Sequence, residues 1–334
     1  MKANEIDTLG KHFPPSQADP QRRALLAGLA GFGGLAAAGL GLPAWAQQPA
    51  ASASGTRIIL VGTKGGPRVG GERSNPCTAL LIDGVPYVID CGQGVARQLV
   101  QAGISLRDLR YVFLTHMHSD HNLEYGGLLY SAWATGLKDK VAVYGPPPLE
   151  EMTQAFFEYM KFDIDTRIGD EGKPDPRKLV ETHTYDRDGV ILQNAQVKVS
   201  AARNIHPPIH HSYGLRFDTR DRSVVVSGDT NYSEAIVKLA TGADVLVHEA
   251  IYVPGVDAML KRVPNAATLR EHLLASHTTT EDVGRVAAEA GVKKLVLTHL
   301  VPGDDPGITD EMWLEGVRKH YKGEVVVGKD LMVL

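Results

Sequence analysis

A short stretch of the chain, LTHMHSDHN at residues 114–122, concentrates side chains that can bind metal ions. Within six positions it contains His116, His118, Asp120 and His121. In an extended loop the first two histidines point the same way and can chelate one ion, while Asp120 and His121 lie beyond them and can reach a second. The alternative interpretation is a solvated polar loop.

Four apolar segments of the sequence run into a histidine or an aspartate. They lead to His116, Asp229, His248 and His299, which lie far apart in the chain. Because open α/β sheets bind ligands outside the carboxyl ends of their strands, we expect these four positions to converge. That convergence favours a metal site over a solvated loop.

The donor types indicate which metals and which chemistry to expect. Neutral imidazoles and carboxylates are donors that zinc accepts, and two cysteines cannot form a thiolate cluster. We therefore predict two zinc ions, with manganese and iron as alternatives. Asp229, in the segment SGDT, could bridge both ions, and two bridged ions activate a hydroxide for hydrolysis at phosphorus, sulfur or a carbonyl centre.

The segments that must position these residues alternate between strand and helix patterns. Strands are predicted at 110–116, 141–147, 196–202, 214–218, 222–229, 243–250, 293–299 and 323–328, and CTALLIDGVPYVIDCG at 77–92 reads as a hairpin with an Asp83-Gly84 turn. Helices are predicted at 93–103, 149–161, 232–240, 265–275, 280–290 and 308–320, the fifth with a Thr278/Glu281 capping box. Alternation of this kind predicts an α/β layered fold.

Residues 57–334 read as a single hydrolase domain with one inserted segment. The segment covers residues 150–190 and joins an aromatic helix containing Phe156, Phe157 and Tyr159 to the polar stretch DEGKPDPRK. Two interpretations of this segment are possible from the sequence: a lid over the site or an elaborated sheet edge.

The N-terminal region has the features of a bacterial export signal. Residues 1–46 place Arg22 and Arg23 ahead of a Gly/Ala/Leu-rich run that ends in Ala-Trp-Ala, which predicts a cleaved signal of the twin-arginine type. Residues 47–56 would be a disordered lead-in. An uncleaved membrane anchor and export of the unfolded chain are the alternatives. The prediction is a periplasmic protein without membrane attachment after cleavage.

Charge and cysteine content limit the partners. Removal of the four basic and three acidic side chains of residues 1–46 changes the formal net charge from −4 to −5. An acidic surface does not favour long polyanions such as nucleic acids. The only cysteines, Cys77 and Cys91, could pair in an oxidising compartment or remain free.

Several motifs together resemble one known family. His116-Met117-His118-Ser119-Asp120-His121 matches the HxHxDH signature of the metallo-β-lactamase fold, and the resemblance covers nearly all of residues 57–334. The segments RSNPCTALLIDGVPYVIDCGQGVARQL, SGDTN, LVHEA and SHTTTEDVGRVAAEAGVKKLVLTHL resemble the ribonuclease Z and arylsulfatase-like branch, in the same order. The resemblance implies a four-layer αβ/βα sandwich.

The resemblance also implies a ligand set. The first zinc would take His116, His118 and a later histidine, the second would take Asp120, His121 and His299, and Asp229 would bridge them. For the later histidine we choose His206, because related His-Pro-Pro segments precede an aromatic-Gly-x-Arg strand by a similar distance. His210 is the rival candidate.

Further residues are expected to take part in proton transfer and support. In the resembling branch, the Glu and His that correspond to Glu249 and His277 are associated with protonation of the leaving group, so we expect His277 to be a general acid oriented by Glu249. With Asp120 and His248 they form the expected catalytic set. A buried polar network is the alternative for the pair. Asp90 is expected to orient the metal loop.

The predicted function is an exported dinuclear zinc hydrolase for a small phosphodiester, aryl sulfate or related ester, without a nucleic-acid partner and with a homodimer left open. Export, the acidic charge and the lack of room for a tRNA-gripping arm between Arg216 and Asp229 are the reasons against RNA. The alternatives are a ribonuclease Z-like endonuclease, a lactonase, β-lactamase or hydrolytic dehalogenase, and a non-catalytic metal-bound binding or sensor protein.

Overall fold

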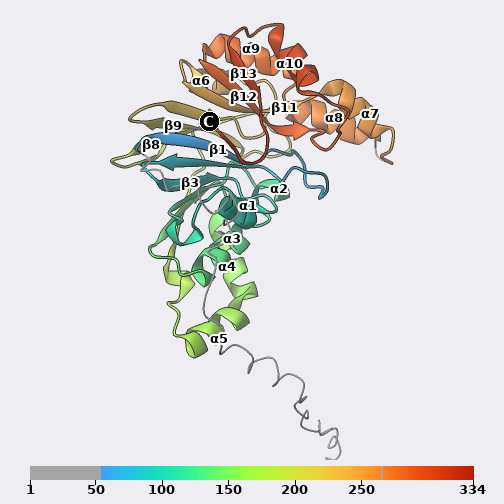
Figure 1. The fold of residues 1–334 in the computed structure, drawn as a ribbon. Coiled ribbons are helices and arrows are strands. Elements are labelled where there is room, and N and C mark those ends of the chain that lie inside the picture. The colour runs from blue at the N-terminus through green and yellow to red at the C-terminus, as the bar shows by residue number, and fades with distance from the viewer. Residues whose placement is uncertain (1–53, 265) are drawn as a thin grey trace, which may run out of the picture. The chain divides into compact units, whose positions relative to one another are not determined.

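The computed structural model describes residues 54–264 and 266–334 (Figure 1). The predicted export signal and most of the predicted lead-in lie outside the described residues, so both stay predictions. None of the helices in the described part of the chain is both long enough and apolar enough to span a lipid bilayer.

The described residues form two seven-stranded mixed sheets. The first has the order β14-β1-β2-β3-β4-β5-β6, with β1 (Thr56–Gly62), β2 (Cys77–Ile82), β3 (Val85–Ile89), β4 (Tyr111–Phe113), β5 (Val141–Gly145), β6 (Val180–Thr184) and β14 (Met332–Val333). The second has the order β13-β12-β11-β10-β9-β8-β7, with β7 (Gly189–Gln193), β8 (Val197–Arg203), β9 (Tyr213–Thr219), β10 (Ser223–Val226), β11 (Val245–Ile251), β12 (Lys294–Val301) and β13 (Glu324–Val327). Strands β3 to β6 and β10 to β13 run parallel.

Helices cover the outer faces of both sheets (Figure 1). Those beside or beyond the first sheet are α1 (Val95–Gln101), η3 (Leu106–Asp108), α2 (Ser119–Asn122), α3 (Tyr125–Ala134), α4 (Leu149–Tyr159), α5 (Lys161–Glu171) and η4 (Pro176–Lys178). Those that follow strands of the second sheet are α6 (Glu234–Ala240), α7 (Val253–Leu260), α8 (Ala266–Ser276), α9 (Thr280–Ala290) and α10 (Asp310–Arg318).

Side chains alternate between two cores along the central strands of both sheets. On β4, Phe113 points between the sheets and packs with Phe217 of β9, while Val112 points to the outer core with Leu99 of α1. Strands buried on both faces need apolar residues at every position, which explains the continuous apolar runs of the sequence. The layers are therefore helix, sheet, sheet and helix, and the predicted sandwich fold is confirmed.

The predicted hairpin is present between β2 and β3. Asp83 and Gly84 have φ values of 49° and 82°, and Ile82 pairs directly with Val85. A two-residue turn with positive φ at both central positions matches the twist of antiparallel strands. The two cysteines near this hairpin, Cys77 and Cys91, are both buried and free.

Some elements differ from the sequence prediction. Helix α3 was missed because its sequence, YGGLLYSAWA, has buried apolar residues on several sides and no clear helical period. The cap of α9 lies one residue later than predicted: Thr279 Oγ1 accepts a hydrogen bond from the Asp282 backbone N–H at 3.2 Å, while the Thr278 hydroxyl donates to the Thr230 carbonyl.

The segment at 150–190 contributes to the edges of both sheets. It supplies β6, the edge strand of the first sheet, and the start of β7, the edge strand of the second. Its helices α4 and α5 lead away from the sheets (Figure 1).

We expect Phe217→Ala to lower the free energy of unfolding by about 3–5 kcal/mol, because the removed ring is fully buried between the sheets and contacts Phe113. The matched control is Phe162→Ala, since Phe162 is 87% exposed, and its effect should stay within about 0.5 kcal/mol. Urea denaturation of both variants measures the difference, and equal losses would contradict this packing.

Candidate metal centre

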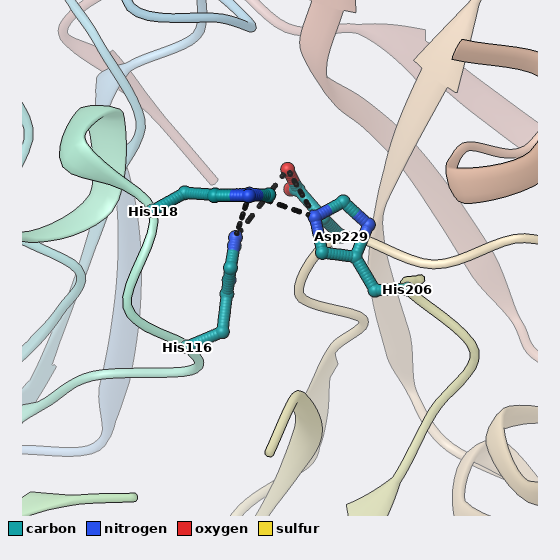
Figure 2. A group of neighbouring side chains, drawn as sticks. All are labelled: His116, His118, His206 and Asp229. Carbon is teal, nitrogen blue, oxygen red and sulfur yellow. Dashed lines mark hydrogen bonds and ion pairs between the residues drawn. The ribbon is translucent and has the colours of Figure 1, made fainter. Parts of the chain in front are cut away.

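Seven side chains from distant parts of the sequence converge beside the ends of β4 and β10. They form two groups that share Asp229, and within each group one donor atom of every residue lies within 4.8 Å of the others. The first group is His116, His118, His206 and Asp229. The second group is Asp120, His121, Asp229 and His299. Figure 2 shows the first group, with the three rings and the Asp229 carboxylate facing a common centre. The structure thus brings together all seven positions that the sequence proposed as ligands. The rival His210 is exposed and belongs to neither group.

The loop after β4 places four of these residues by changing its conformation once. The chain stays extended up to His118, which has φ −69° and ψ 148° and precedes α2. In the extended part, His116 and His118 point toward the same centre (Figure 2). The first turn of α2 then carries Asp120 and His121, which are both buried and face the second group.

The first group has the geometry of three donors aimed at one point. His118 Nδ1 lies 3.1 Å from His116 Nε2 and 2.9 Å from His206 Nε2. The burial of His116 and His206 lowers their pKa values, that of His206 to about 4, so that both rings are neutral near pH 7. Neutral rings in this arrangement direct nitrogen lone pairs toward a shared position, which suits a cation.

Neighbouring groups fix which nitrogen faces that position. His206 Nδ1 donates to the Ser276 carbonyl at 2.8 Å, and His116 Nδ1 lies 3.1 Å from Thr115 Oγ1. In both residues the Nε2 atom is therefore the one that is free to bind. Such hydrogen bonds hold metal-binding histidines in the required tautomer and orientation.

Asp90 supports the loop from behind, as the sequence indicated. Its carboxylate accepts from the Thr115 backbone N–H at 2.8 Å, and its other oxygen lies 2.8 Å from His121 Nδ1. Asp90 itself has a left-handed φ of 62°, a conformation that a non-glycine residue adopts at a cost and that is found at functional sites. One carboxylate thus orients both the start of the loop and one ligand.

Asp229 is shared by both groups. Its Oδ2 atom lies 3.2 Å from His121 Nε2, 3.1 Å from His299 Nε2 and 3.8 Å from His116 Nε2. Its other oxygen, Oδ1, is buried and makes no hydrogen bond among the described residues. A buried carboxylate oxygen without a partner is costly, and a cation would remove that cost.

The electrostatics of the second group also suit a cation. Burial alone would raise the pKa of Asp229 and lower that of His299, but their mutual attraction outweighs burial, so the pKa of Asp229 is well below its usual value and that of His299 rises to about 10. The pKa of His121 is raised for the same reason. Without a metal these histidines carry protons that balance the carboxylate charge. Metal binding would replace those protons.

His299 reaches the centre through a bulge in β12. Thr298 pairs with Glu249 and Leu300 with Ala250, so His299 has no partner on β11, and its φ is 43°. Strand β12 therefore continues through His299, whereas the sequence placed the strand end there. A bulge redirects a side chain in this way.

A glycine makes room for the redirected ring. A Cβ atom at Gly65 would lie 2.6 Å from His299 Nδ1 and 2.4 Å from a methyl of Val301. The Gly-rich turn therefore packs directly against the site. The next residue, Gly66, donates its backbone N–H to Asp120 Oδ2 at 2.9 Å.

A buried histidine and glutamate, His277 and Glu249, form a third such group with His299 of the second. His277 Nδ1 and Glu249 Oε1 are 2.9 Å apart, and the ring of His277 stacks on that of His299 with centroids 5.4 Å apart. Burial would lower the pKa of His277, but the charge and hydrogen bond of Glu249 raise it. His248 belongs to none of these groups, and its Nδ1 donates to the Glu249 carbonyl. Residues two apart on a strand share a face, so His248 lies on the same face of β11 as Leu246, which packs into the outer helical core.

A cavity of about 770 Å³ opens over these residues. Its base includes His118, Asp120, Asp229, His277 and His299, and its walls come from the Gly-rich turn, from α7 and α8, and from the loop at 301–306. No residue of the 150–190 segment lines it.

One histidine of this cavity was given no role by the sequence. His272 of α8 lines the wall, with its ring centroid 6.5 Å from that of His118 and 6.2 Å from that of His277. It lies in no motif, and only its position five residues before His277 could have suggested a role.

The amino-acid sequence is similar to that of known metal-dependent hydrolases. A family model described as beta-lactamase superfamily domain matches residues 81–300. The chain is 31% identical over 283 residues to ribonuclease Z of Mycobacterium bovis, covering 82% of this chain and 96% of the relative, and 34% identical over 277 residues to ribonuclease Z of a Mycobacterium species, covering 82% and 94%.

Solved structures share the fold. The metallo-beta-lactamase fold protein YhfI of Bacillus subtilis superposes with a TM-score of 0.63 and 20% identity, covering 84% of this chain and 99% of that chain. The short form of human tRNase Z superposes with a TM-score of 0.61 and 20% identity, covering 83% and 98%.

These relatives contradict the predicted partners. From the sequence we expected a small-molecule ester and no nucleic acid, whereas the chain matches curated relatives named ribonuclease Z over nearly their full length. The net charge was a poor guide because it averages over the whole surface. The cavity lining, for example, includes the cationic Lys64, Arg68 and Arg262 beside the acidic Asp304 and Asp305, a pattern that a net charge does not report.

We expect Asp90→Asn to weaken zinc binding by about 10–100-fold, because it removes the charge that orients Thr115 and His121. Competition with a chromophoric chelator measures the affinity. Asp139→Asn is the matched control, since Asp139 is exposed and pairs only with Arg110. Unchanged zinc affinity in the Asp90 variant would contradict the supporting role.

Proposed function

The chain belongs to the metallo-β-lactamase superfamily of metal-dependent hydrolases, and we propose that within it this protein is a ribonuclease Z-like phosphodiesterase that cleaves RNA. The observation that carries the proposal is the identity of 31–34% to ribonuclease Z over at least 94% of the relatives, found in a chain whose proposed ligands all converge. The substrate that we now propose is therefore RNA and not the small ester expected from the sequence.

The donor set fits two divalent cations. His116, His118 and His206 would hold one ion, Asp120, His121 and His299 a second, and Asp229 would lie between them. The unpartnered Asp229 Oδ1 and the converging neutral nitrogens are the observations that support this assignment. Zinc is the metal we propose, because the donors are imidazoles and carboxylates. Bound ions of this kind activate water and stabilise negative charge that develops on a phosphate.

The protein's own residues have distinct tasks in this proposal. Asp120 is held by the Gly66 N–H and keeps its charge on the cavity side of the second group. His277 faces the cavity, the charge of Glu249 raises its pKa, and its protonated form can give a proton to the departing oxygen. Glu249 is a positioning residue, because it holds His277 Nδ1 while its Oε1 also accepts from the Thr230 N–H at 2.7 Å.

Export is a separate proposal that concerns where the substrate is met. It depends on residues 1–46, which lie outside the described residues. Fractionation of cells that express the full chain tests it independently of the chemistry, since cytoplasmic retention of the uncleaved chain would exclude export.

We expect the zinc-loaded chain to cut a tRNA that carries a 3′ extension, and we expect chelation of the metal to abolish the cleavage. Asp229→Asn should lower the rate by at least about a hundredfold, because the residue is shared by both groups. Gel analysis of the products measures the cleavage, and Asp139→Asn serves as the unaffected control. Hydrolysis of a nitrophenyl phosphodiester without any cleavage of RNA would contradict the RNA substrate, and failure on both would contradict the phosphodiesterase.

We expect Glu249→Gln to move the alkaline limb of the pH–rate profile to lower pH. The protonated form of His277 acts as the acid, so activity is present below the pKa of His277 and is lost above it. Removal of the Glu249 charge lowers this pKa, because that charge and its hydrogen bond hold it above the usual value. The amide oxygen can still accept from Thr230, so the local structure is kept. A uniform loss of rate without a shift of the limb would show that the pair only braces the sheet.

A further inference from the structure

One wall of the cavity is apolar. Among the residues that line it, Met259 lies at the end of α7, Val263 between the two helices, and Leu269 on α8. All three are half-buried and also pack against a separate apolar cluster that includes Val256 and Leu260. The side chains therefore have a supported inner side and a face that is open to the cavity.

This wall is attached to the catalytic end of the site. Helix α8 ends at Ser276, directly before His277, and the Ser276 carbonyl holds His206 Nδ1. Asn231 donates to the carbonyls of Leu274 and Ala275 at 2.9 and 3.0 Å. The apolar face of α8 is consequently held at a fixed position relative to the proposed metal ligands, which a subsite for part of the substrate requires.

Charged side chains of both signs line the cavity outside the ligand groups: Lys64, Arg68 and Arg262 are cationic, and Asp304 and Asp305 are acidic. Arg262 follows α7, which carries part of the apolar wall, and Arg68 belongs to the Gly-rich turn. Neither has an ion-pair partner within 4 Å in residues 54–264 and 266–334, whereas Lys64 is paired with Asp304 at 2.9 Å. Unpaired arginines in the cavity lining suit a ligand that carries phosphate groups.

We propose that the wall formed by Met259, Val263 and Leu269 is the subsite that receives the nucleobase next to the scissile phosphate. The inference rests on the proposed function. A nucleotide combines an apolar base face with an anionic phosphate, and the cavity combines an apolar wall with the proposed metal ligands and two arginines without an ion-pair partner. Its volume of about 770 Å³ is in the range of pockets that enclose whole small ligands.

Two probes that differ only in the base test the subsite. Calorimetry on the zinc-loaded full chain compares uridine 5′-monophosphate with ribose 5-phosphate, which share the phosphate and the sugar. We expect the nucleotide to bind about tenfold more tightly, because only it can cover the apolar wall. Equal affinities would overturn the proposal. This measurement needs no turnover, so absent RNA cleavage would count against the proposed function alone.

Two leucines on α8 provide a matched pair of variants. Leu269 and Leu274 are both half-buried and both pack against the same apolar cluster, but only Leu269 lines the cavity. We expect Leu269→Ala to remove most of the preference for the nucleotide and Leu274→Ala to keep it. Met259→Ala, on the other helix, should also reduce the preference.

Affinity for ribose 5-phosphate controls for damage to the fold, and it should be unchanged in all three variants. If Leu274→Ala reduced the preference as strongly as Leu269→Ala, or if neither Leu269→Ala nor Met259→Ala reduced it, the assignment of the base to this wall would be wrong.

Discussion

The site depends on one buried carboxylate that several imidazoles surround. Asp229 follows β10, and its Oδ2 atom lies within 4 Å of His116 and His121 from the loop after β4 and of His299 from β12. A buried negative charge must be compensated, and here every compensating group is a histidine that can exchange its proton for a metal. The remaining features, such as the support from Asp90 and the Gly-rich turn, serve to keep those rings directed at this carboxylate.

Much of this arrangement was accessible from the sequence because its signals are local. The spacing of His116, His118, Asp120 and His121 and the apolar strand before them determine a loop with four donors, and the structure places them as expected. Asp229 also follows a short β-branched strand. The fold class followed from the alternation of strands and helices together with the resemblance to a family. Buried strands and a motif at a strand end carry their information within a few residues.

Features that depend on tertiary contacts were not accessible in the same way. The bulge at His299 arises from pairing with β11, and no residue of KLVLTHLV marks it. His272 becomes part of the cavity only because α8 packs over the site. The expected partner was wrong because a net charge says nothing about where the charges lie, and Arg68 and Arg262 line the cavity of a chain whose net charge is negative. The segment at 150–190 was one candidate for a lid over the site, yet no residue of it lines the cavity, whereas residues of α7 and α8 do.

The bulge in β12 has a consequence for how such a site can arise and disappear. Leu295, Leu297 and Leu300 all pack into the same outer core, which breaks the regular alternation by one residue at His299. Without His299 the strand would be a regular ladder with the same leucines on the same face. A single inserted or deleted codon can therefore add or remove this donor while the core stays intact. Within one architecture, catalytic and non-catalytic descendants can be separated by a change of one residue in length.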